Sequence, residues 1–193
     1  MRTIKKVASH IFIDGFGGMT QGLFATLIIG TMIQQIGLLI GGSTGNVIYL
    51  LGKAAAALTS AGIGVGVAVK YGESPLVTVS AAVAAMVGGY AGKITGGTFF
   101  VDGNAVLAGP GEPLGAFIAA FAGITCGHLV SGKTKVDIIV TPVITIGAGS
   151  VVGLLVGPPI SQMMTGLGSI INWATEQRPF IMGIVVSVVM GMF

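Results

Sequence analysis

The sequence predicts an all-α integral membrane protein. Only 8% of its 193 residues are charged and 53% are hydrophobic, whereas an ordinary soluble domain has roughly 25% charged residues. So few charges could not cover the surface of a soluble fold of this size. The apolar residues form long blocks, and no charged residue occurs from Gly15 through Gly52. Such blocks favour helices, because a helix satisfies its own backbone hydrogen bonds where no water is available.

The amino-terminal residues predict a helix that lies at the membrane surface. In residues 1–14 the apolar side chains recur at helical spacing, and the basic and polar side chains fall largely on the other side. This pattern is typical of an amphipathic interfacial helix. A secretory signal peptide is the alternative, but the following apolar run is longer than a usual signal segment and lacks a small-residue cleavage site.

About six transmembrane helices are predicted from the apolar blocks, since each span needs about 20 residues. The spans are expected near residues 23–40, 47–69, 75–92, 114–130 and 136–156, with a sixth beginning at 179. Residues 94–113 and 158–178 are apolar but interrupted by proline, glycine and polar residues. Both are predicted to be broken or re-entrant segments, because irregular backbone at membrane depth requires a cover of protein or a water-filled cavity. Residues 1–193 thus form one transmembrane domain.

The distribution of basic residues predicts the orientation of the chain. Lys70, Lys133, Lys135 and the amino-terminal basic residues fall on one side of this topology, and Lys93 and Arg178 fall on the other. The side with more basic residues should be cytoplasmic, so the amino terminus is expected in the cytoplasm. The net charge of +3 comes from too few residues to form a nucleic-acid surface.

Glycines spaced four residues apart predict close helix packing. This spacing places them on one helix face, where a neighbouring backbone can approach, and we expect at least a dimer from these faces. A parallel internal repeat is also possible, because the segments after Pro75 and Pro142 resemble each other and each continues to a glutamate followed by a proline. Chance similarity in a biased sequence is an equal alternative. The glycine faces comprise Gly37/Gly41, Gly62/Gly66, Gly88/Gly92, Gly123/Gly127 and Gly149/Gly153/Gly157.

The candidate substrate-binding residues lie in the two broken segments. Glu112 sits in a Gly-Pro-Gly-Glu-Pro block, with Asp102 and Asn104 earlier in the same segment. A carboxylate at membrane depth is costly and usually faces a cavity or a partner, so Glu112 could accept hydrogen bonds from sugar hydroxyls, coordinate a cation or carry a proton. The alternative is a helix cap, because a helix amino terminus favours negative charge. Glu176 and Arg178 are the counterparts in the second segment, where an interfacial anchor at Trp173 is the alternative.

An enzyme active site is not expected. The sequence has neither the spacing of a nucleophile and its base nor a cluster of metal ligands, so no catalytic residue, metal or cofactor is predicted. The single cysteine, Cys126, excludes a disulfide framework within the chain.

Four stretches of the sequence together resemble the phosphotransferase-system EIIC-like membrane proteins, in the group that includes the perfringolysin O regulatory protein. The resemblance covers essentially the whole chain, and the Gly-Pro-Gly-Glu-Pro block is its most specific part. The chain is shorter than expected for this family, which suggests a truncated product or a half-size version completed by dimerisation. The four stretches are residues 9–15, 61–66, 109–117 and 156–161.

The resemblance implies a permease subunit in a bacterial inner membrane that binds and translocates a sugar or related small polar solute. By similarity, Glu112 would contact the sugar. Separate IIA and IIB phosphoryl carriers would be the partners, because neither module is present in this sequence. The alternative is a membrane sensor or regulatory protein that binds a ligand without net transport.

Overall fold

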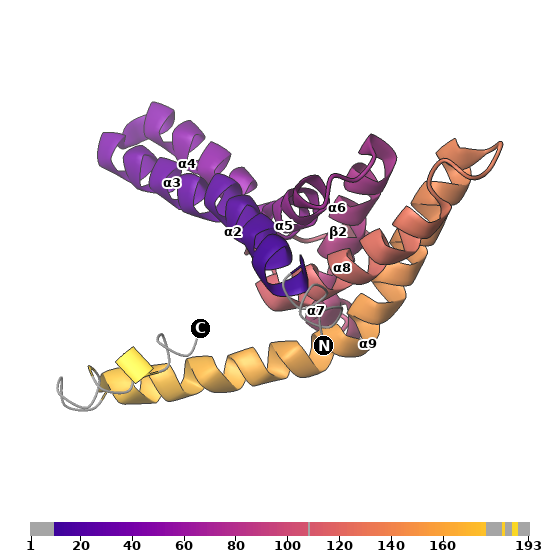
Figure 1. The fold of residues 1–193 in the computed structure, drawn as a ribbon. Helices are drawn as coiled ribbons and strands as arrows, with labels where there is room; N and C mark the ends of the chain where they lie inside the picture. The colour runs from indigo at the N-terminus through magenta and orange to yellow at the C-terminus, as the bar shows by residue number, and fades with distance from the viewer. Residues whose placement is uncertain (1–9, 108, 177–182, 184–186, 189–193) are drawn as a thin grey trace.

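The computed structural model describes residues 10–107, 109–176, 183 and 187–188, and most of them are helical (Figure 1). The described residues begin with a long apolar helix, and its part Ile13–Ile40 is long enough to cross a membrane. The predicted span 23–40 lies inside it. Residues 1–9 of the predicted interfacial helix are outside the described residues, and residues 10–14 belong to the long helix. Its consecutive parts are η1 (His10–Gly15), α2 (Phe16–Leu23), η2 (Phe24–Ile28) and α3 (Ile29–Ile40), with η1 and η2 in π-helical form.

The second predicted span, 47–69, is a bent pair of helices. A single residue, Leu58, separates helix α4 (Gly42–Ala57) from helix α5 (Thr59–Lys70), and their axes differ by 52°. The bend is at Leu58, whose φ of −87° and ψ of 9° lie in the bridge region outside the α-helical range. Helices α3 and α4 pack side by side and extend away from the other helices (Figure 1). We call this pair, residues 29–57, the arm.

The core of the protein lies between α5, α6 (Pro75–Gly89), α8 (Pro113–Val130) and the first part of α9 (Asp137–Glu176). Helix α6 begins at Pro75, and the Ser74 hydroxyl accepts a hydrogen bond from the Val77 N–H at 3.4 Å, so serine caps a helix whose first residue is proline. The buried side chains are mostly small and aliphatic: Ile63, Val67, Ala68, Val77, Ala81, Ala85, Ala116, Phe117, Ala120 and Ile124.

Glycine faces bring these helices into close contact, as the spacing predicts. A Cβ atom added at Gly66 would lie 2.3 Å from the carbonyl oxygen of Gly18, and one added at Gly88 would lie 2.5 Å from that of Gly115. Only glycine fits where backbones approach this closely. These two faces pack within the chain, so they do not by themselves argue for the predicted dimer.

Residues 94–113 are broken, as predicted. The short helix α7 (Ala91–Thr95) is followed by a two-stranded antiparallel hairpin, β1 (Phe100–Val101) and β2 (Asn104–Ala105). The hairpin turn places Asp102 at a φ of 50° and Gly103 at a φ of 78°, which are left-handed values that suit a tight turn. The loop that follows leads to Glu112, directly before α8.

The prediction of a separate broken segment at 158–178 is wrong for its described part. Residues 158–176 continue α9, which contains Pro142, Pro158 and Pro159. Proline removes a helical hydrogen bond and bends a helix without always ending it, and α9 changes direction where it passes α7 in Figure 1. Gln177, Arg178 and most of the predicted sixth span lie outside the described residues.

Three helices of the described chain are long and apolar enough to cross a membrane, or four if the bent pair α4–α5 is one span. The predicted count of six is therefore not confirmed. Helix α6 covers the third predicted span but has only 15 residues. The internal repeat is not confirmed either, because Pro75 begins a helix whereas Pro142 lies within one.

The Lys70 end of α5 and the turn that carries Lys133 lie at the same end of the core. The Nδ1 atom of His128, in the last turn of α8, is 3.0 Å from a carboxylate oxygen of Glu73, and the Ser74 and Ser131 hydroxyl oxygens are 3.0 Å apart. The first helix reaches this end too, because Gly15 lies beside Tyr71. Which side of the membrane this end faces stays a prediction.

Candidate functional site

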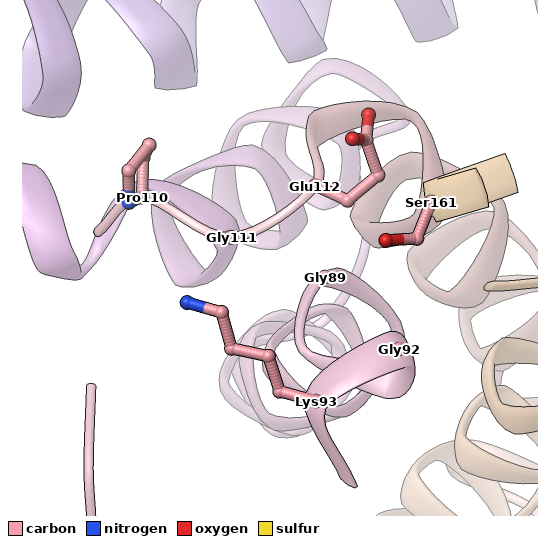
Figure 2. Close-up of a pocket in the computed structure, with 7 residues that line it drawn as sticks. All are labelled: Gly89, Gly92, Lys93, Pro110, Gly111, Glu112 and Ser161. Atoms are coloured by element: carbon pink, nitrogen blue, oxygen red, sulfur yellow. The ribbon is translucent and has the colours of Figure 1, made fainter. Parts of the chain in front are cut away.

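A cavity of about 210 Å³ lies at the opposite end of the core, beside the Gly-Pro-Gly-Glu-Pro block. Three elements surround it: the carboxyl end of α6 with α7, the loop before α8, and α9. Glu112, Lys93 and Ser161 contribute its polar side chains, as Figure 2 shows. The remaining lining residues are Gly89, Gly92, Pro110 and Gly111.

Glu112 lies at the junction between its loop and α8. It is the N-cap of α8, and its Oε1 atom accepts a hydrogen bond from the Leu114 N–H at 3.4 Å. This is a long bond for an amide donor, so the carboxylate retains acceptor capacity for other donors. Glu112 is half-buried and also lines the cavity. The helix cap predicted as the alternative to a binding role is therefore present, and Glu112 also lies at the cavity wall.

The loop that carries Glu112 is fixed by hydrogen bonds to two other helices. The Glu112 N–H donates to the Gly89 carbonyl oxygen at 2.6 Å, and the Ser60 hydroxyl donates to the Pro110 carbonyl oxygen at 3.0 Å. Gly111 has a φ of 76°, and a Cβ atom there would lie 2.5 Å from Ser60 Oγ. Glycine is therefore required at this position both by the backbone conformation and by the space.

Lys93 brings a positive charge to the cavity from α7. Its Nζ atom lies 5.3 Å from the centroid of the Tyr90 ring, within the range of a cation–π interaction. Figure 2 shows the Lys93 side chain extending beneath the Pro110–Gly111 backbone, with Glu112 on the far side of that segment. The cavity is thus bordered by one carboxylate, one ammonium group and one hydroxyl.

Ser161 reaches the cavity from α9. It follows Gly149, Gly153 and Gly157 at the same spacing of four, so it continues their helix face. That face packs on α6 and α7, and a Cβ atom added at Gly92 would lie 2.8 Å from Ser161 Oγ. Neither Ser161 nor Lys93 is among the site residues predicted from the sequence. Extending the glycine face by one further step would have identified Ser161.

Asp102 and Asn104, two of the other predicted site residues, do not line this cavity. Asp102 and Asn104 are exposed in the hairpin, where the Asn104 side-chain amide donates to the Asp102 carbonyl oxygen at 3.3 Å. Glu176 is the last residue of α9, whose yellow end in Figure 1 lies away from α8. The Glu176 side chain and Arg178 lie outside the described part of the chain. The structure therefore brings Glu112 together with Lys93 and Ser161 instead.

No group of three or more His, Cys, Asp or Glu side chains within the described ranges has the arrangement of a metal site. The polar groups of the cavity are suited to hydrogen bonding. A carboxylate accepts, an ammonium group donates, and a hydroxyl does both.

Comparison with curated proteins and with solved structures finds no match. A family model described as "Phosphotransferase system, EIIC" matches residues 13–193. This range contains all the spans described above, the cavity and the loop before α8. The chain is a membrane protein of sugar transport, and it belongs to the phosphotransferase-system EIIC family.

Proposed function

We propose that the chain is an EIIC-like permease subunit that binds and translocates a sugar or related small polar solute in the cavity beside Glu112. The observation that carries this proposal is the cavity itself. It combines Glu112, Lys93 and Ser161 on a loop and helices that are held by hydrogen bonds. Its volume of about 210 Å³ is below the range of about 300–1,000 Å³ common for sites of drug-sized ligands, which suits a small solute.

The polar lining matches the chemistry of a polyhydroxylated solute. Each sugar hydroxyl can donate one hydrogen bond and accept others. The Glu112 carboxylate would accept from such hydroxyls, the Lys93 ammonium group would donate to them, and Ser161 would do either. Three glycines among the lining residues leave room for a sugar ring close to the backbone.

The position of the cavity suits a transport role. It lies at one end of α8, and the basic turns lie at the other. Helix α8 has 18 residues, which corresponds to about 27 Å of helix. We propose that the cavity end faces outward and that the basic end faces the cytoplasm of a bacterial cell, where separate IIA and IIB phosphoryl carriers would act. We also propose a homodimer in the inner membrane. In this role the chain moves the solute and performs no catalysis itself.

Substitution of Glu112 by Gln tests the proposal. The variant keeps the shape but removes the charge, and loss of a charged hydrogen bond costs roughly 1.5–3 kcal/mol, which corresponds to about 10- to 150-fold weaker binding. Purified protein would first be screened with hexoses and polyols for thermal stabilisation, because a ligand of the native state raises apparent stability. The affinity of the identified solute is then measured for wild type and Glu112→Gln.

Asp102→Asn is the matched control, because it removes a carboxylate of the same region that does not line the cavity. It should bind the solute like the wild type. A well-folded Glu112→Gln protein with unchanged affinity would exclude Glu112 from the site. A stability loss of about 1 kcal/mol in Glu112→Ala with full affinity would leave Glu112 only the role of a helix cap. Solute uptake into vesicles by the wild type then separates transport from binding alone.

A further inference from the structure

We infer that Tyr90 is the positioning residue of this cavity: it holds both charged side chains in place and links the Glu112 loop to the bend at the base of the arm. Tyr90 lies between α6 and α7 and is fully buried. The inference deepens the proposed function and rests on it for the importance of the cavity. Its test needs no ligand, so a failure of this inference can be distinguished from a failure of the proposed function.

The Tyr90 hydroxyl contacts two backbone carbonyl groups. It lies 3.1 Å from the carbonyl oxygen of Ala57 and also donates to that of Gly109. Ala57 is the last residue of α4, and Gly109 begins the loop that leads to Glu112. A phenol has a single hydrogen, so these two carbonyl groups share one donor.

Both carbonyl groups lie where regular secondary structure supplies no hydrogen-bond donor. The last carbonyl groups of a helix have no partner within that helix, which applies to Ala57 at the end of α4. Gly109 lies in a loop outside any helix or strand. Gly109 is exposed and Ala57 is half-buried, but both hydrogen bonds are partly buried, and a carbonyl group that loses its donor away from water is destabilised. The Tyr90 hydroxyl therefore stabilises the end of the arm and the start of the loop at the same time.

The Tyr90 ring interacts with the second charged side chain, that of Lys93. Lys93 Nζ lies 5.3 Å from the ring centroid, so the ring face attracts the ammonium group. The ring and the hydroxyl of one residue thus act on different sides of the cavity. The ring positions Lys93, and the hydroxyl positions the loop that carries Glu112.

The geometry of the bend makes this link sensitive to the direction of the arm. Leu58 separates Ala57, on the arm side, from Thr59 and Ser60, on the core side. Ser60 holds Pro110 of the same loop at 3.0 Å. Movement of α4 about Leu58 would displace Ala57 but not Ser60, and it would change how the Tyr90 hydroxyl is shared. The direction of the arm and the position of the loop are therefore coupled through one hydrogen atom.

Hydrogen exchange in Tyr90→Phe tests the positioning of the loop. The variant keeps the ring and removes the hydroxyl, and Tyr49→Phe on the arm is the matched control. In full-length protein in nanodiscs, amide exchange of Gly109, Gly111 and Glu112 should rise about fivefold in Tyr90→Phe, as expected for loss of one partly buried hydrogen bond. Tyr49→Phe should leave it unchanged. Wild-type exchange in Tyr90→Phe would overturn the inference.

The coupling to the arm needs a separate readout, which a purely local role of Tyr90 would not change. Spin labels at Asn46 on α4 and Val79 on α6, both exposed, report the distance between arm and core in a Cys126→Ala background of wild-type thermal stability. We expect Tyr90→Phe to shift or broaden this distance distribution and Tyr49→Phe to preserve it. Faster loop exchange with an unchanged distribution would overturn the coupling.

A change on the other side of the link provides an independent test if Tyr90→Phe does not fold. The Thr59 hydroxyl donates to the Ala56 carbonyl oxygen at 2.6 Å across the bend. Thr59→Val removes this bond with little change in volume and leaves the loop sequence unaltered. Coupling predicts faster amide exchange of Gly109, Gly111 and Glu112 in Thr59→Val. Exchange at the wild-type rate, together with a changed distance between arm and core, would show that the bend and the loop are independent.

Discussion

The backbone N–H of Glu112 donates a hydrogen bond to the carbonyl oxygen of Gly89 across 2.6 Å. Gly89 is the last residue of α6, and Glu112 is the residue directly before α8. The carbonyl groups at a helix end lack partners within that helix, and the loop supplies one of them. The end of α6 and the beginning of α8 are therefore joined, and the cavity lies at this junction.

We expect Gly111→Ala to displace the loop that carries Glu112. A Cβ atom at Gly111 would lie 2.5 Å from Ser60 Oγ, at a φ of 76°, so the variant suffers both backbone strain and a clash. We predict a stability loss of about 1–3 kcal/mol and weaker solute binding. Thermal unfolding and solute affinity in detergent measure the two effects.

Gly97→Ala is the matched control for Gly111→Ala, because Gly97 has a φ of 71° with no atom within 4 Å of an added Cβ. Gly97→Ala has the backbone strain without the clash, so its loss of stability should be smaller and its solute affinity should be unchanged. Equal losses in the two variants would show that the contact with Ser60 has no role in holding the loop.

Two glycine substitutions within helices should differ in their effect on the stability of the protein. Gly66→Ala places a Cβ atom 2.3 Å from the Gly18 carbonyl oxygen, whereas nothing lies within 4 Å of an added Cβ at Gly147. We expect Gly66→Ala to destabilise the protein by about 0.5–3 kcal/mol because backbone must move. Gly147→Ala should be neutral or stabilising by up to about 1 kcal/mol, because alanine favours a helix. Thermal unfolding in one detergent compares them, and equal effects would contradict the packing of α5 on the first helix.

The Glu73–His128 pair should contribute little to stability. The two side chains approach to 3.0 Å; that of Glu73 is only 8% exposed, but that of His128 is 70% exposed, so water screens the pair and we expect the roughly 0.2–1 kcal/mol of exposed pairs. A double-mutant cycle with Glu73→Gln and His128→Gln should give a coupling energy in this range. The same cycle in the presence of 1 M salt serves as the control, because salt screens exposed charges. A much larger coupling would show that this contact fixes the basic end of the core.

Cysteine labelling tests the orientation of the core. In a Cys126→Ala background, Lys133→Cys lies in a basic turn, and Asp102→Cys lies in the hairpin that precedes the other end of α8. We expect a membrane-impermeant thiol reagent on intact cells to label position 102 and to leave position 133 unlabelled, because the basic end should be cytoplasmic. Permeabilised cells, in which both should react, provide the control. The reverse pattern would invert the proposed orientation.

Much of the architecture follows from residue types and their local order. Apolar blocks identify the membrane-spanning helices, because the free energy of burying apolar side chains is a property of each residue in turn. Glycine spacing identified faces that do pack closely, and the Gly-Pro-Gly-Glu-Pro block identified a non-helical loop with Glu112 at its end. These features depend on neighbours within a few residues, so the sequence determines them.

Tertiary structure decided what local order does not encode. Pro158 and Pro159 predict a break in the chain, but α9 continues through them, since packing on neighbouring helices can offset a lost helical hydrogen bond. Asp102 shares a segment with Glu112 yet lies outside the cavity, whereas Ser161 reaches it from α9, far along the chain. Which helices meet at the cavity, and hence which side chains border it, depends on contacts between distant segments, and these are fixed only when the helices pack.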